Sequence, residues 1–166
     1  EVIQALARSE LCLLPSQYVY TLVFNANSEE AVAKIESTEL GDKNIATMLP
    51  PGSAFRFVDF EALGRINPSV TAETVNKIYR TYPAGVVLPF KEGLREDLVS
   101  PKRASNGKLV PTFTNIWNDK YDFYRWLHQD IKAYNAACNN EAEQIILAGT
   151  SANPKDRMPF SEFDYA

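Results

Sequence analysis

The sequence predicts an α+β fold, a single domain in which a small sheet of about three strands is packed with helices. Thr114–Gly149 has no Pro and no Gly before its last residue, and its apolar residues recur every three or four positions, which predicts a long, dominant C-terminal amphipathic helix. Gln17–Asn25 is apolar on both of its alternating faces, as in a strand inside a sheet. Residues 150–166 carry prolines and isolated aromatics, which predicts an extended tail after a single domain at residues 1–149.

The long helix is expected to bury one stripe of side chains. The stripe consists of Trp117, Tyr121, Tyr124, Leu127, Ile131, Tyr134, Cys138, Ala142 and Ile145. Asn140 stands three residues before Glu143, the spacing of a capping box, so two helices, or a helix followed by a strand at Gln144–Ala148, are alternatives. Because the stripe keeps its phase past Asn140, we expect residues 141–148 to continue the helix.

The remaining predicted helices and strands are shorter. They are predicted from the positions of Gly and Pro, which end helices and strands, and from the alternation of side-chain types along the chain. Helices are predicted at Val2–Leu14, from Asn27, and from Asn67 to Tyr82; strands are predicted at Phe55–Phe60 and Val86–Phe90. Pro89 has no amide to donate to a ladder, which places the last strand at an edge. Gly41–Ala54 and Lys91–Pro111 are rich in breakers and are expected to be loops.

Length and composition limit the function classes. The chain has 166 residues, 45% of them hydrophobic, enough for one soluble core. Its net charge of −4 argues against a dedicated DNA-binding protein but does not exclude a local basic groove. No apolar run approaches the roughly 18 residues that span a bilayer, so no membrane partner is expected.

The sequence carries few residues for metal or nucleophile chemistry. Cys12 and Cys138 lie far apart in apolar patterns, so they are expected to be buried free thiols or, as the alternative, a disulfide. With two cysteines and the single histidine His128, no zinc site and no cofactor are predicted. His128 is expected to flank the helix stripe, held by a hydrogen bond. Phosphate-binding glycine motifs and a GxSxG nucleophile motif are absent from the sequence.

Glu141 and Glu143 form a Glu-x-Glu pair before an apolar run. A Glu-x-Glu that enters a strand resembles the catalytic corner of arginine-directed ADP-ribosyltransferases. The resemblance implies that one carboxylate holds a ribose hydroxyl and stabilises an oxocarbenium-like transition state while the other orients the acceptor. The family also carries an Arg on its first strand, and Tyr18–Asn25 has none. On a helix, the two glutamates are instead expected to be solvated.

Two further groups of residues are candidates for binding. Arg95, Lys102, Arg103 and Lys108 cluster in one irregular stretch of an acidic chain and could contact RNA phosphates. Phe160, Phe163 and Tyr165 lie on the tail and could dock into a groove of the same chain or of a second copy.

These observations favour a non-enzymatic structural subunit that self-associates, coat-like or filament-like, as a homo-oligomer with a possible RNA contact. The first alternative is an ADP-ribosyltransferase-like enzyme that uses Glu141 and Glu143. The second alternative is a partner-binding adaptor domain.

Overall fold

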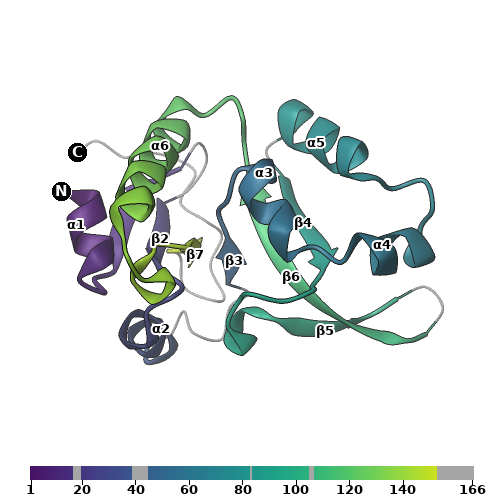
Figure 1. Ribbon diagram of the computed structural model, residues 1–166, viewed down its shortest axis with the longest axis horizontal. Coiled ribbons are helices and arrows are strands. Elements are labelled where there is room, and N and C mark those ends of the chain that lie inside the picture. Colours follow the sequence, from purple (N-terminus) through teal and green to yellow (C-terminus); the bar gives the residue numbers. More distant parts are fainter. Residues whose placement is uncertain (17–19, 39–44, 83, 105–106, 153–166) are drawn as a thin grey trace. The chain divides into compact units, whose positions relative to one another are not determined.

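The computed structural model describes residues 1–16, 20–38, 45–82, 84–104 and 107–152. These residues form an α/β fold with seven strands, paired in both parallel and antiparallel ways, and six α-helices (Figure 1). The chain divides into two compact units, the first made of Glu1–Ile45 and Gln129–Ala166, the second of Ala46–His128. None of the helices in the described ranges is long and apolar enough to cross a membrane.

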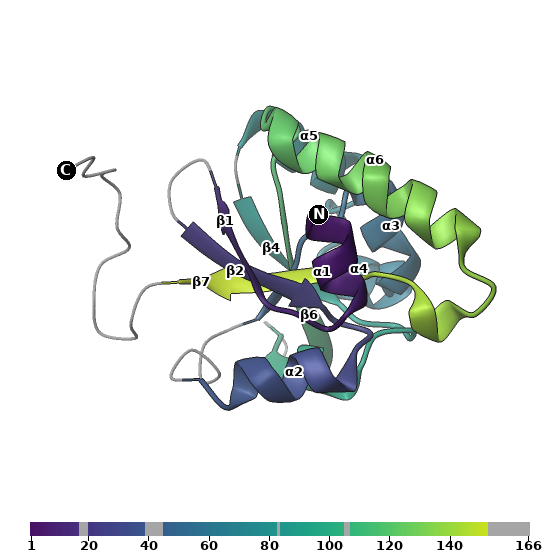
Figure 2. The same cartoon turned by 90° about the vertical axis from the view of Figure 1, so that its left-hand side faces the viewer.

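The strands of the first unit form an antiparallel group with β2 at its centre (Figure 2). The elements of this unit are α1 (Val2–Ala7), β1 (Cys12–Pro15), β2 (Tyr20–Asn25), α2 (Glu29–Glu36), η3 (Glu141–Glu143) and β7 (Leu147–Ser151). β2 pairs with β1 on one side and β7 on the other, and its Val23 and Phe24 are fully buried. The prediction of an inner strand is confirmed over residues 20–25, while residues 17–19 lie outside the described residues.

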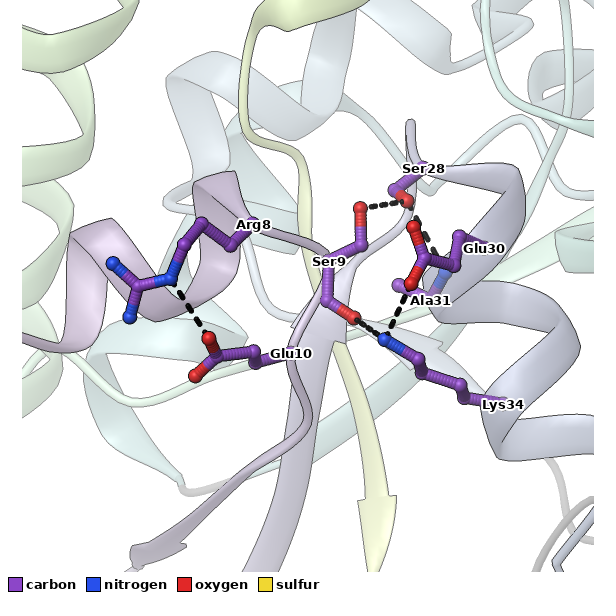
Figure 3. A network of polar contacts seen from close by, with 7 residues as sticks. All are labelled: Arg8, Ser9, Glu10, Ser28, Glu30, Ala31 and Lys34. Carbon is purple, nitrogen blue, oxygen red and sulfur yellow. Dashed lines mark hydrogen bonds and ion pairs between the residues drawn. The ribbon is translucent and has the colours of Figure 1, made fainter.

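A polar network ends α1 and starts α2 (Figure 3). The chain turns at Ser9, whose φ of 61° few non-glycine residues adopt, so the helix predicted at Val2–Leu14 stops after Ala7 and β1 follows. Ser28 caps α2 by accepting a hydrogen bond from the Ala31 amide at 3.1 Å, and its hydroxyl donates to the Ser9 hydroxyl at 2.6 Å. Lys34 donates to the Ser9 carbonyl at 3.0 Å, which fixes the turn against α2.

The strands of the second unit pair with β6. The elements are β3 (Ala46–Thr47), α3 (Pro51–Ala54), η1 (Phe55–Phe57), α4 (Phe60–Ile66), α5 (Ala72–Thr81), β4 (Ala84–Pro89), η2 (Glu96–Leu98), β5 (Ser100–Arg103) and β6 (Leu109–Trp117). β3 runs parallel to β6, whereas β4 and β5 run antiparallel to it. β4 stands at the end of the strand order, so the predicted edge strand is confirmed.

The predicted strand Phe55–Phe60 is wrong. Asp59 accepts a hydrogen bond from the Ala62 amide at 2.8 Å and thereby starts α4, and the preceding residues form the 3₁₀ turn η1. A run of six apolar and polar residues fits a strand or a helix end equally well, so periodicity could not separate them. The single helix predicted from Asn67 is also shorter than expected, because Thr71 and Thr74 form a capping box that starts α5.

The prediction of a small sheet dominated by one long C-terminal helix is wrong. Thr114–Trp117 belong to β6, and the helix α6 spans only Asp122–Ala137, followed by η3 and β7. Asn118 makes the turn between strand and helix, because its side-chain oxygen accepts from the Lys120 amide at 3.0 Å. Helix and strand together could mimic one helix stripe because no Gly or Pro separates them.

Three residues of the apolar stripe are nevertheless buried on α6, and Tyr134 on the same helix is half-buried. Tyr124, Leu127 and Ile131 are between 4% and 6% exposed, as expected. Trp117 is equally buried but lies on β6, and Cys138 is half-buried just past the end of the helix. The three- or four-residue spacing of apolar residues therefore reflects a helix only over α6. Before and after α6, the same spacing occurs by chance in segments that are not part of this helix.

A buried amide locks β3 to β6 in the second unit. Asn115 is fully buried, and its side-chain oxygen accepts from the Thr47 hydroxyl at 2.9 Å and the Leu49 amide at 3.0 Å. Its side-chain nitrogen donates to the Leu49 carbonyl and the Tyr79 hydroxyl, each at 3.1 Å. Because the short β3 has only two residues, these side-chain bonds replace the ladder that a longer strand would form.

Candidate functional site

The four basic residues predicted to contact RNA lie around the β5–β6 hairpin and η2. Lys102 and Arg103 are exposed on β5, and Lys108 is exposed just before β6. Arg103 donates to the Gly107 carbonyl at 2.8 Å, while Arg95 pairs with Asp97 at 2.9 Å beside η2. The structure thus gathers three of the four on one hairpin, and the RNA contact itself stays a prediction.

Glu141 and Glu143 lie on η3 and are exposed. The expected continuation of the helix is wrong here, because the Asn140 side chain accepts from the Ala142 amide at 3.0 Å and starts a new turn. The alternative of a helix followed by a strand at Gln144–Ala148 agrees better with the structure, since β7 begins four residues after Glu143. Both glutamates precede that strand, so the strand-borne carboxylate pair that the transferase reading requires is not formed.

His128 is a buried, neutral histidine. Its Nε2 donates to the Met48 carbonyl, and its ring lies 5.1 Å from the Trp117 ring in an edge arrangement. Burial lowers the pKa of His128 to about 4, an effect that the hydrogen bond to Met48 opposes only in part. The prediction that a hydrogen bond holds this histidine is confirmed.

Acidification is expected to destabilise the protein through His128. The unfolded side chain takes up a proton near its ordinary pKa of 6.5, whereas the folded one does so only near 4. Between these values the unfolded state binds more protons, so stability is full above pH 6.5 and falls towards pH 4, by on the order of 3 kcal/mol.

Urea melts of the wild type and of His128→Gln across pH 4 to 7 check this expectation, since the chain has one histidine. The difference in unfolding free energy between the two proteins should shrink as the pH falls. A difference that stays constant over this range contradicts the buried neutral histidine.

The cysteines do not pair. Cys12 and Cys138 are free, so the disulfide alternative is wrong and the prediction of free thiols is confirmed, but both side chains are half-buried and not buried as expected. Burial raises the pKa of the Cys12 thiol, which makes it a poor nucleophile at neutral pH. Within the described ranges, no three His, Cys, Asp or Glu side chains are grouped as metal ligands would be.

Hydroxyl side chains gather at one end of the strand group in the first unit. Thr21 opposes Ser151 across β2 and β7, and Thr150 opposes Leu22. Ser16 follows β1, whose last residue Pro15 opposes Tyr20 at the start of β2. These residues therefore lie at the same end of the strand group, which we call the hydroxyl end (Ser16, Thr21, Thr150 and Ser151). Thr21 and Ser151 point to one face of the group and Thr150 points to the other.

The pairing at the hydroxyl end brings two hydroxyls close together. The Ala152 amide donates to the Tyr20 carbonyl at 2.9 Å, so the next pair inwards, Thr21 and Ser151, is the non-hydrogen-bonded kind in which side chains approach most closely. Thr21 and Thr150 are 8% and 5% exposed, whereas Ser151 is half-buried. A serine or threonine hydroxyl can both donate and accept a hydrogen bond.

The hydroxyl end was not predicted from the sequence. Thr150 and Ser151 were assigned to the extended tail, although they end β7. The sequence signal for β7 was the apolar run at 145–148, which Gly149 and the two hydroxyl residues follow. The tail residues predicted for self-association, Phe160, Phe163 and Tyr165, lie outside the described residues.

The fold resembles that of Sua5. No protein-family model and no curated protein matches the chain. A doubly substituted Sua5 from P. abyssi superposes with a TM-score of 0.53 at 20% identity, over 92% of this chain and 39% of that one. P. abyssi Sua5 in complex with L-threonine superposes with a TM-score of 0.50 at 19% identity, over 92% of this chain and 37% of that one. The chain therefore spans less than half the length of these Sua5 structures.

This likeness corrects the predicted function. The prediction of a coat-like or filament-like structural subunit is wrong, because the chain has the fold of Sua5, a fold that in one of these structures binds a small molecule, L-threonine. The error arose because the prediction rested mainly on motifs that are absent from the sequence.

Proposed function

We propose that this chain is the ligand-binding domain of an enzyme with a Sua5-like fold, and that its substrate is a small amino acid. The observation that carries the proposal is the likeness to Sua5 over 92% of the chain. The L-threonine complex belongs to Sua5, and it makes L-threonine the first compound to test with this chain.

The hydroxyl end is the proposed place for this ligand. An amino acid presents a carboxylate that needs donors and an ammonium that needs acceptors, and each Ser or Thr hydroxyl supplies both. Thr21 is β-branched and buried, so its hydroxyl is held in few orientations before the ligand arrives, and its cross-strand partner Ser151 lies on the same face of the strand group. Such pre-organisation reduces the entropy that binding would otherwise cost.

Calorimetric titration with L-threonine tests the proposal. The wild type should release saturable heat, and Ser151→Ala and Thr21→Val should each weaken binding by about tenfold, because a hydrogen bond to a charged group is lost. Ser53→Ala is the matched control, since Ser53 is exposed on α3 in the second unit and should leave the affinity unchanged.

L-Valine separates specific recognition from general amino-acid binding. It has nearly the shape of L-threonine but lacks the hydroxyl, so a site built to bond that hydroxyl should bind it more weakly. Absence of L-threonine binding at about 10 mM, or equal weakening by Ser53→Ala and Ser151→Ala, would contradict the proposal.

A further inference from the structure

A pocket of about 390 Å³ lies in the second unit between α4 and the start of β6. Ile66, Phe90 and Leu109 form much of its apolar wall, and Arg65 and Lys108 bring positive charge to it. Phe90 is held in place by its amide, which donates to the Pro111 carbonyl at 2.9 Å, and by an edge contact with Phe113. A pocket of this volume with an apolar wall and few polar groups is typical of small-molecule sites.

Two cations, Arg65 and Lys108, and one carboxylate, Asp59, line the pocket. An oxygen of that carboxylate accepts a hydrogen bond from the Ala62 amide at 2.8 Å as the cap of α4. Arg65 forms an ion pair with Glu61 one turn earlier on the exposed side of the helix. Exposed pairs of this kind contribute little, and a guanidinium has five N–H donors, so Arg65 can bind a second anion.

The apolar side chains at the pocket indicate which kind of ligand would fit it. Leu109 is 63% exposed, an unusual fraction for a leucine on a strand, and it borders the pocket together with Lys108. A ring or short aliphatic chain that entered the pocket would cover Leu109 and contact Phe90 while an acidic group stayed near the two cations.

We propose that this pocket binds a small organic anion with an aromatic or aliphatic body, whose acidic group, a phosphate or a carboxylate, lies between Arg65 and Lys108. The pocket shares no residue with the hydroxyl end, so the inference holds whether or not the chain binds an amino acid.

Titration of the ¹⁵N-labelled chain with phenyl phosphate, benzoate and benzyl alcohol tests this inference by NMR. We expect saturable shifts at the amides of Ala62, Phe90 and Val110, with a Kd on the order of 1 mM for at least one of the two anions. The neutral alcohol should bind at least about tenfold more weakly, because it forms no charge-assisted bond. Comparison of the two anions distinguishes a phosphate site from a carboxylate site.

Three charge variants complete the test. Lys108→Glu should weaken anion binding by about tenfold, whereas Lys102→Glu, the same charge change on the exposed strand β5, should leave it nearly unchanged. Glu61→Gln should strengthen binding, because it removes the carboxylate that competes for Arg65. Equal effects of Lys108→Glu and Lys102→Glu, equal binding of the alcohol, or no saturable shift for either anion would overturn the inference.

Discussion

Replacing Asn115 by Ala is expected to lower the free energy of unfolding by about 3–5 kcal/mol. The substitution removes the oxygen and the nitrogen that bond Thr47, Leu49 and Tyr79. These groups lie in a buried part of the second unit, so the polar atoms left behind lose a partner that water does not readily replace. Urea melts followed by circular dichroism measure the effect.

Asn67→Ala is the matched control for this expectation. Asn67 is exposed, and its side chain accepts one local hydrogen bond from the Ser69 amide at 3.1 Å. Its loss should cost no more than about 1 kcal/mol. If the two asparagine variants melt at the same urea concentration, the amide of Asn115 does not hold β3 to β6.

Leu127→Ala is expected to cost about 2–5 kcal/mol, the range for a leucine removed from a packed core. Leu127 is 6% exposed on the buried face of α6, while its neighbour Trp126 is 61% exposed on the other face. Trp126→Ala should therefore change stability by less than about 0.5 kcal/mol despite its larger loss of volume. A larger loss for Trp126→Ala than for Leu127→Ala would reverse the assignment of the two faces.

Local sequence patterns correctly predicted those parts of the fold that depend on the burial of a single helix or strand. The two-sided apolar alternation of β2 and the stripe of α6 each reflect burial of a single element, and both are confirmed where the structure describes them. The ends of helices and strands that are determined by one side chain were not predicted. Ser9, Asp59 and Asn118 each start or end an element through a turn or a cap, and such residues also occur in loops without doing so.

The extent of the strand pairing could not be read from the sequence. β3 has two residues and β5 is exposed along its whole length, so neither has an apolar pattern. β3 forms because β6 offers it a partner that is distant in sequence, Asn115 for Thr47, whereas β5 forms the first strand of a hairpin with β6, in which Ser100 pairs with Thr112. Long-range pairing of this kind is a property of the whole chain, which is why the sheet was underestimated.

The candidate site was hidden for a related reason. Thr21 and Ser151 are far apart in the sequence and are common strand residues, and only the register of β2 with β7 brings them together. The residues that stood out by charge, Glu141 and Glu143, are solvated on a 3₁₀ turn. Charged residues can be recognised in the sequence, whereas the pairing of Thr21 with Ser151 is known only from the structure.

Chemical-shift mapping during a titration with L-threonine tests the proposed ligand site most directly. The predicted result is a set of saturable shifts at the amides of Thr21, Thr150 and Ser151, and at the Ala152 amide that bonds Tyr20. These shifts should disappear in Thr21→Val. Saturable shifts confined to the second unit, or no shifts at a ligand concentration of about 10 mM, would contradict an amino-acid site at the hydroxyl end.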